Sequence, residues 1–252
     1  TLAESPGHFN YDKARQGGLN AAFMAVYISP SMREEGGAFN LANQLIDLVE
    51  DSISRNPDKF AAALTPEDIE ENFSRNLVSL PMGIENGTAL EGKLENIRYF
   101  YDRGIRYITL THSRSNEICD SSFDPERVWK GLSPFGREVV AEMNRLGIMI
   151  DVSHASDDAF YQVLELSKAP VLATHSSCRH FVPGLERDMS DEMIVKLAEK
   201  GGVIQINFCT SFLDQEYARA YEELSGKYRA FLEAEKLGRE DARPREYREK
   251  LW

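Results

Sequence analysis

Short apolar runs rich in β-branched residues alternate with amphipathic stretches along most of the chain. Each run has the length and composition of a buried strand, and each adjacent stretch has the apolar spacing of a helix. Alternating units of this kind predict an α/β fold, with a parallel sheet covered by helices. The predicted strands cover residues 22–29, 77–85, 105–112, 148–154, 170–175 and 201–208.

Capping residues mark where several helices begin. Thr65-Pro66 and Ser133-Pro134 place a hydroxyl at the N-cap and proline in the first turn, and Ser156 is a third N-cap. Gly147 is expected to end the helix that starts at Pro134. Residues 1–20 are polar, with an isolated His8, and are expected to form a solvated loop. The predicted helices cover residues 41–53, 65–76, 89–102, 133–146, 156–167 and 190–200.

The last part of the chain is highly charged and carries aromatic residues at helical spacing. This pattern predicts a long amphipathic helix whose aromatic stripe packs on the barrel or on a partner chain, so a homodimer is one expectation. Residues 239–250 are expected to be a solvated face or a mobile tail. We interpret residues 1–210 as a barrel portion and residues 211–252 as a helical extension of the same domain. The stripe consists of Tyr217, Tyr221, Leu224, Tyr228 and Phe231.

Composition narrows the class of protein. Hydrophobic residues make up 42% of the chain and charged residues 28%, as in ordinary soluble globular proteins. The net charge of −12 argues against nucleic acid and against an anionic membrane surface as partners. A helix that spans a bilayer needs about 18 apolar residues in a row, and no run here approaches that length. The sequence also does not begin with the pattern of a signal peptide. The compartment stays open, with an exported or periplasmic location as one expectation.

Three cysteines, Cys119, Cys178 and Cys209, are too few and too widely spaced for a disulfide framework or a CxxC metal motif. Common catalytic motifs are also absent: GxSxG, GxxxxGK[ST], GxGxxG and HExxH do not occur. A serine triad built on Ser153 or Ser176 would lack the nucleophile elbow, so we disfavour it.

Two histidines follow consecutive predicted strands that are joined by one helix. His154 and His175 have the same strand parity as the buried residues before them, so both imidazoles point the same way. The carboxyl ends of parallel strands share one edge, where α/β folds place their chemistry. A shared transition metal is therefore one hypothesis, and a hydrogen-bonded pair of structural histidines is the alternative.

Two further predicted strands end on Glu85 and His112. A carboxylate with two histidines suits zinc or a similar divalent ion, which lowers the pKa of bound water and polarises a carbonyl group. Amide hydrolysis fits such a site, and a barrel becomes more probable than an open sheet because four strand ends carry polar groups. His112 is either a further ligand or an unligated imidazole that donates to an oxyanion.

Two more polar residues accompany this set. Arg187, in the loop after His175, could hold a substrate carboxylate with its planar guanidinium, although a surface arginine is the alternative. Asp151 has the opposite strand parity to His154, so we interpret it as a supporting group and not a ligand.

Six blocks of sequence, in order, resemble the membrane dipeptidase (renal dipeptidase) family of zinc peptidases over about residues 18–213. The resemblance implies a (β/α)8 TIM-barrel metallohydrolase with two zinc ions that cleaves dipeptides and tolerates a D-residue at the C-terminal position. It also implies that Glu85 bridges the metals and that His154 and His175 bind the second zinc. His112 would contact the substrate or tetrahedral intermediate, and Arg187 the substrate carboxylate. The blocks are residues 82–87, 107–112, 151–154, 173–177, 186–191 and 201–208.

The chain departs from the family pattern in three places. The His-x-Asp pair of the family's first strand and its late Gly-Ser-Asp motif are absent, and Arg187-Asp188 stands where the family often has Arg-Asn. We therefore expect a barrel portion without its first and last strands. A portion of a full enzyme is favoured because free sheet edges are a liability for an independent protein. The alternative is a degenerate, noncatalytic relative that serves as a peptide-binding or interaction module.

Overall fold

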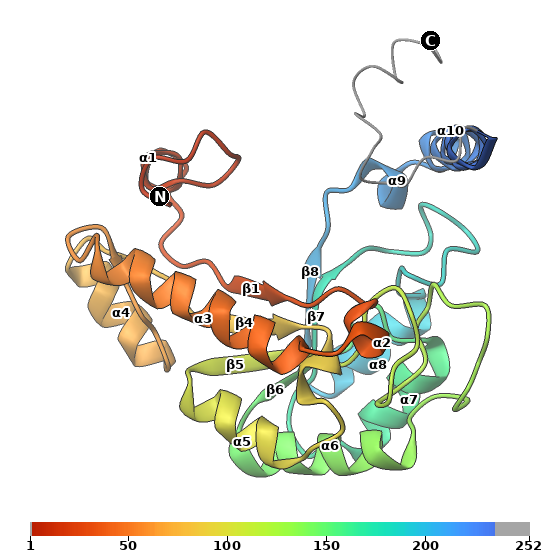
Figure 1. Ribbon diagram of the computed structural model, residues 1–252, viewed down its shortest axis with the longest axis horizontal. Coiled ribbons are helices and arrows are strands. Elements are labelled where there is room, and N and C mark those ends of the chain that lie inside the picture. Colours follow the sequence, from red (N-terminus) through yellow and green to blue (C-terminus); the bar gives the residue numbers. More distant parts are fainter. Residues whose placement is uncertain (1, 235–252) are drawn as a thin grey trace.

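The computed structural model describes residues 2–234 of the chain. Six strands form one parallel sheet that curls into part of a barrel (Figure 1). Their spatial order follows their order in the sequence, so each connection leads to the adjacent strand, and β1 and β8 form the edges within these residues. The strands are β1 (Met24–Tyr27), β4 (Met82–Glu85), β5 (Ile105–Thr109), β6 (Met149–Asp151), β7 (Leu172–Ser176) and β8 (Val203–Ile206).

Helices cover the outer face of the curled sheet, as Figure 1 shows for α5 to α8 along its lower side. Neighbouring helices pack on one another, and α3, α5, α6 and α8 pack on β1, β5, β6 and β8, respectively. Their apolar stripes, including the fully buried Phe100 and Phe160, form the core with the sheet. The helices are α3 (Ala38–Ser54), α5 (Glu95–Asp102), α6 (Pro134–Leu146), α7 (Asp157–Leu166) and α8 (Asp191–Glu199).

The predicted capping residues set the helix boundaries. The Ser133 hydroxyl accepts a hydrogen bond from the Gly136 amide at 2.9 Å, and the Ser156 hydroxyl accepts one from the Ala159 amide at 3.3 Å. Gly147 ends α6 in a left-handed conformation, with φ of 81°. Thr65 caps α4 (Pro66–Ser74) in a complete capping box.

Two predicted elements are divided in the structure. Residues 77–85 form two strands, because Pro81 has no amide hydrogen for a ladder: β3 (Val78–Ser79) pairs with β2 (Phe60–Ala61), and β4 pairs with β1. Residues 89–102 are split because Glu91 and Gly92 both have positive φ, of 48° and 69°. A short 3-10 helix, η1 (Gly87–Leu90), therefore precedes α5.

The first residues hold more structure than expected. Residues 1–20 were predicted as loop, yet Asn10 caps α1 (Tyr11–Gln16) by accepting a hydrogen bond from the Lys13 amide at 2.8 Å. His8 is exposed, as predicted. A further short helix, α2 (Met32–Glu35), follows β1.

The predicted C-terminal helix is confirmed through residue 234. The short α9 (Thr210–Leu213) leads into α10 (Gln215–Ala234), where the stacked rings of Tyr217 and Tyr221 line a groove together with Phe123 and Leu185. Residues 239–250 lie outside the described range, and the division at residue 210 stays a prediction. Within residues 2–234, no helix has the length and apolar character needed to cross a membrane.

Candidate metal and substrate site

Four polar side chains from different strands meet at the carboxyl end of the sheet. Glu85 is the last residue of β4, and His175 lies within β7. His112 and His154 were predicted as the last residues of strands, but they come three residues after β5 and β6 end and therefore lie in loops. The parallel order β4–β5–β6–β7 brings the four groups to one edge.

The functional atoms of these side chains converge. Glu85 Oε1 lies 3.1 Å from His175 Nε2, 3.4 Å from His154 Nε2 and 3.5 Å from His112 Nε2. The Nε2 atoms of His154 and His175 are 2.9 Å apart. All three imidazoles therefore place Nε2 within 3.5 Å of the same carboxylate oxygen, although His154 lies in a loop, where strand parity does not set its direction.

A buried chain of hydrogen bonds orients His175. Asp151 Oδ2 accepts hydrogen bonds at 2.6 Å from the hydroxyls of Thr109 and Thr174. The Thr174 hydroxyl also lies 2.8 Å from His175 Nδ1. Because that hydroxyl donates to Asp151, it accepts the proton of Nδ1 and leaves the Nε2 lone pair facing Glu85. Asp151 therefore acts as a supporting group, which agrees with its opposite strand parity.

His154 is held in an unusual backbone conformation. Its φ is 70°, a left-handed value that is strained for a residue other than glycine. The Ser122 amide donates to the His154 carbonyl oxygen at 2.8 Å, and the imidazole packs on the ring of His112 with centroids 4.1 Å apart. Tyr27, at the end of β1, packs on the other side of His112 at 5.0 Å.

The protonation states suit metal binding. Burial raises the pKa of Glu85, but the contacts with His154 and His175 outweigh burial and hold that pKa well below its ordinary value. Burial lowers the pKa of His154 to about 3 and also lowers the pKa of His112. At neutral pH, Glu85 is therefore ionised and both of these imidazoles are neutral, as metal ligands must be.

This donor set fits a divalent metal ion. The ligand atoms of Glu85, His112 and His154 lie within 4.8 Å of one another, and His175 joins them through its short distances to Glu85 and His154. Neutral imidazoles and a carboxylate present lone pairs, which repel at these distances unless a cation or shared proton lies between them. Imidazole nitrogen with carboxylate oxygen is a typical zinc set.

Arg187 lies beside this cluster and is almost fully buried. Its guanidinium donates to the Ser176 hydroxyl at 2.9 Å and to the carbonyl oxygen of His175, and it packs under the ring of Phe212 at 5.4 Å. Nε has no hydrogen-bond partner among the described residues. Burial lowers the pKa of Arg187 to about 10, so it stays positively charged at neutral pH. The alternative of a surface arginine is therefore wrong.

A cavity of about 620 Å³ opens beside the cluster on the inner side of the sheet. Glu85 and His175 line it together with Tyr107, Phe23 and Gln205. The inner wall is tightly fitted where Tyr107 crosses β4, because a Cβ atom at residue 83 would lie 2.1 Å from the Tyr107 ring. Only glycine fits there, so Gly83 allows Tyr107 to form part of the cavity wall.

Sequence reasoning missed several groups that hold the site together. Thr174 was not singled out, although it orients His175. Asn86, which follows Glu85 with φ of 86°, donates to the Ile28 carbonyl oxygen at 3.0 Å. The Asn-Gly pair after a strand is a usable signal, because asparagine tolerates positive φ. The loop between His112 and Ser133 gave no comparable signal.

Comparisons with known proteins point to one family. The model of the membrane dipeptidase family (Peptidase family M19) matches residues 1–241. An uncharacterized dipeptidase of Schizosaccharomyces pombe is 33% identical over 84% of this chain and 54% of its own length. Dipeptidase 3 of Mus musculus is 36% identical over 82% of this chain and 42% of its own length.

Solved structures of similar fold include metallopeptidases. A metallopeptidase from Rhodobacter sphaeroides, liganded with a phosphinate mimic of L-Ala-D-Ala, has a TM-score of 0.75 with 25% identity over 84% of this chain and 68% of its own. A probable dipeptidase from Pseudomonas aeruginosa has a TM-score of 0.74 with 29% identity over 81% of this chain and 54% of its own.

These structures confirm the predicted α/β fold of TIM-barrel type. The chain spans about half the length of the relatives named above, dipeptidase 3 and the yeast protein. The family match covers nearly all of the chain and includes every residue of the donor cluster. The chain therefore belongs to the membrane dipeptidase family, Peptidase family M19.

Proposed function

We propose that this chain provides part of the active site of a metal-dependent dipeptidase, with Glu85, His154 and His175 as metal ligands. The observation that carries the proposal is the position of Glu85 Oε1, which lies 3.4 Å from His154 Nε2 and 3.1 Å from His175 Nε2. These distances are close to those that one shared ion requires, so little rearrangement is needed.

Zinc is the metal that we propose. The set of two imidazoles and one carboxylate is typical of zinc, and family membership supports a metallopeptidase. When bound, such an ion supplies Lewis acidity toward the scissile carbonyl and a water molecule of lowered pKa. Glu85 can serve two ions because each carboxylate oxygen can bind one, which agrees with the pair of zinc ions implied by the family resemblance.

His112 and Arg187 are proposed as substrate-binding groups. His112 is neutral, and its side chain is 21% exposed, so its ring can donate a hydrogen bond to the oxygen that gains charge during hydrolysis. Arg187 keeps its positive charge, and its Nε has no hydrogen-bond partner within residues 2–234, which suits binding of the terminal carboxylate of a short peptide. Together they would orient a dipeptide across the metal ligands.

The substrates that we propose are dipeptides, including those with a D-residue at the C-terminal position. The Rhodobacter sphaeroides relative carries a mimic of L-Ala-D-Ala, which supports this choice. L-Ala-D-Ala and L-Ala-L-Ala are therefore the two substrates to compare. An exported location and a homodimer stay predictions of the sequence; sedimentation of the purified protein tests the second.

Metal content and hydrolysis test the proposal together. The full-length protein that contains this chain should bind zinc, hydrolyse L-Ala-D-Ala, lose both properties on chelation and recover them when zinc returns. His154→Gln should lower the zinc content, whereas His112→Gln should keep zinc and lower kcat. Metal loss in both variants would make His112 a ligand. Binding of the dipeptide without turnover would favour the noncatalytic peptide-binding alternative.

A further inference from the structure

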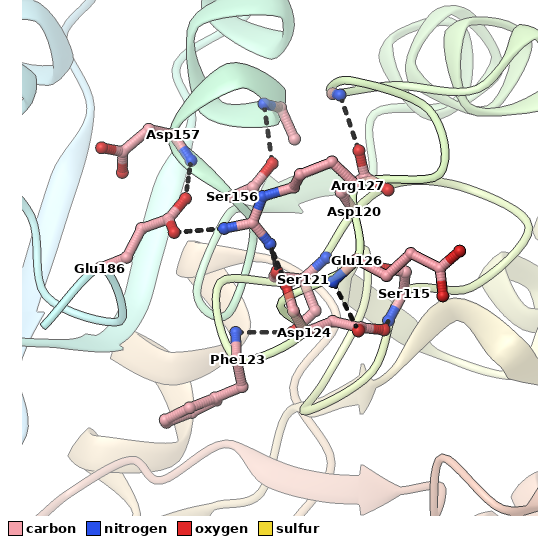
Figure 2. A network of polar contacts seen from close by, with 12 residues as sticks. Ser115, Asp120, Ser121, Phe123, Asp124, Glu126, Arg127, Ser156, Asp157 and Glu186 are labelled. Atoms are coloured by element: carbon pink, nitrogen blue, oxygen red, sulfur yellow. Dashed lines mark hydrogen bonds and ion pairs between the residues drawn. The ribbon is translucent and has the colours of Figure 1, made fainter.

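The loop between β5 and α6 is folded as one body. The Asp120 carboxylate accepts hydrogen bonds from the backbone amides of Val128, Trp129 and Gly131 at 2.9–3.2 Å. Asp124 accepts from the amides of Ser115 and Glu126 at 3.0 and 3.2 Å (Figure 2). These hydrogen bonds couple the positions of the loop residues, so displacing one part of the loop displaces the rest.

One side of this loop contacts the metal-ligand cluster. The Ser122 amide donates to the His154 carbonyl oxygen at 2.8 Å, and the Ser121 hydroxyl donates to the His112 carbonyl oxygen. The ring of Phe123 lies 6.1 Å from the imidazole of His154. The loop therefore borders the positions of both histidines.

Arg127 binds the other side of the loop to the segment that contains Glu186. Its guanidinium donates to the carbonyl oxygens of Ser121 and Asp124 in its own loop, and to Glu186 Oε2 across the site. Figure 2 shows Arg127 between these groups, with Glu186 receiving a second bond, at 3.0 Å, from the amide of Asp157 at the start of α7. Arg127 and Glu186 together join the loop after β5, the start of α7 and the segment that carries Arg187.

Glu186 directly precedes Arg187, the residue proposed to bind the substrate carboxylate. Arg179 holds the backbone on either side of it, by donating to the carbonyl oxygens of Glu186 at 3.1 Å and Asp188 at 2.8 Å. The side chains of Arg127 and Glu186 are 29% and 27% exposed, so their ion pair is only partly screened by solvent. Displacing Glu186 would shift the adjacent Arg187.

We propose that Arg127 is a positioning residue for substrate binding. Through Glu186 it fixes the segment that carries Arg187 against the loop that borders His112 and His154. Its hydrogen bonds within residues 2–234 go to Ser121, Asp124 and Glu186, and none goes to a proposed metal ligand. This inference rests on the proposed dipeptidase function, and it assigns to Arg127 the placement of the group that binds the terminal carboxylate.

Substitution of Arg127 tests this role in the zinc-loaded, full-length protein. Arg127→Met should raise KM for L-Ala-D-Ala about tenfold with a much smaller change in kcat, because the lost interaction serves binding. Zinc content should not change, because strands and their direct extensions supply the ligands. Arg127→Lys keeps the positive charge beside Glu186, so its KM should lie between those of the wild type and Arg127→Met.

A matched control is available on α6. Arg145 pairs with Glu142 at 2.6 Å, but its side chain is 61% exposed, and Arg145→Met should leave KM and kcat unchanged. If Arg127→Met lowers only thermal stability and leaves KM at the wild-type value, the proposal is wrong. Equal KM effects in Arg127→Met and Arg127→Lys would also overturn it.

Hydrogen exchange gives a readout that does not depend on activity. In Arg127→Met, the amides of residues 113–132 and of residues 178–189 should both exchange faster, and in Arg145→Met neither segment should change. A wild-type protein that hydrolyses no dipeptide would refute the proposed function, while the exchange result would still decide whether Arg127 couples the two segments. Unchanged exchange in both segments would refute the coupling.

Discussion

The central strands and the edge strands are built from similar residues but are buried very differently. In β5, every residue except Arg106 is buried. In β8, which is equally rich in β-branched residues, Val203 and Ile206 are 52% and 44% exposed. The difference comes from neighbours: β5 lies between two strands, whereas β8 has a strand on one side only within residues 2–234.

The candidate site follows the same division. Its four converging side chains come from, or closely follow, the central strands β4 to β7. The edge strands contribute to its surroundings: the ring of Tyr27 in β1 lies 5.0 Å from the ring of His112, and Ala25 of β1 and Gln205 of β8 line the cavity. Groups that must be held closely in place lie where backbone neighbours on both sides fix the strand. Substitutions in the two kinds of strand therefore test this contrast.

Truncating one isoleucine in each kind of strand compares their packing directly. Ile108 in β5 is fully buried, so Ile108→Ala should lower the free energy of unfolding by about 2–5 kcal/mol. Ile206 in β8 is 44% exposed, and Ile206→Ala should cost less than about 1 kcal/mol. Urea denaturation followed by circular dichroism measures both. Equal losses would mean that β8 is covered in solution.

Removing the Thr174 hydroxyl tests whether the hydrogen bonds around His175 contribute to zinc affinity. Thr174→Val keeps the side-chain shape but removes the group between Asp151 and His175. Zinc affinity should fall about 10–100-fold, because the imidazole loses the bond that fixes its tautomer and orientation. Competition with a chromogenic chelator measures the affinity.

Two controls separate this effect from general loss of a buried hydrogen bond. Thr174→Ser keeps the hydroxyl and should keep zinc affinity close to that of the wild type. Ser177→Ala removes a buried hydroxyl that donates to the Asn207 carbonyl oxygen at 3.0 Å, on the side of the edge strand β8. It should leave zinc affinity unchanged. A loss of affinity in Ser177→Ala equal to that in Thr174→Val would remove the special role of Thr174.

The sequence predicts the site better than it predicts its surroundings. Glu85 and His175 lie on β4 and β7, so their positions follow from the predicted strands and their parallel order, whereas His154 lies in the loop after β6 with φ of 70°. The bond between Arg127 and Glu186 joins residues 59 positions apart, and the periodicity of the sequence does not predict it. The same limit applies to β8, where apolar composition predicts a strand but not its exposure.

Local backbone chemistry explains the errors in the predicted elements. The apolar run of residues 77–85 continues through Pro81, but proline cannot donate to a ladder, so the chain changes from one sheet to another there. The apolar spacing of residues 89–102 predicts one continuous helix, but Glu91 has a positive φ that interrupts it. Gly92 was the available signal for a break, because glycine adopts that conformation at little cost.

A pH-dependent effect on stability is expected from Asp188, which lies next to Arg187 and is fully buried. Burial raises the pKa of Asp188 from 3.8 to about 6, against the attraction of Arg187, so the folded protein binds its proton more tightly than the unfolded chain does. This stabilisation is present below pH 4 and is lost as pH rises through about 6. The free energy of unfolding of the wild type should therefore fall with pH relative to Asp188→Asn over this range, in urea denaturation at each pH. Asp58→Asn, at an exposed position, should keep the wild-type slope, and parallel curves for the wild type and Asp188→Asn would show that Asp188 does not titrate there.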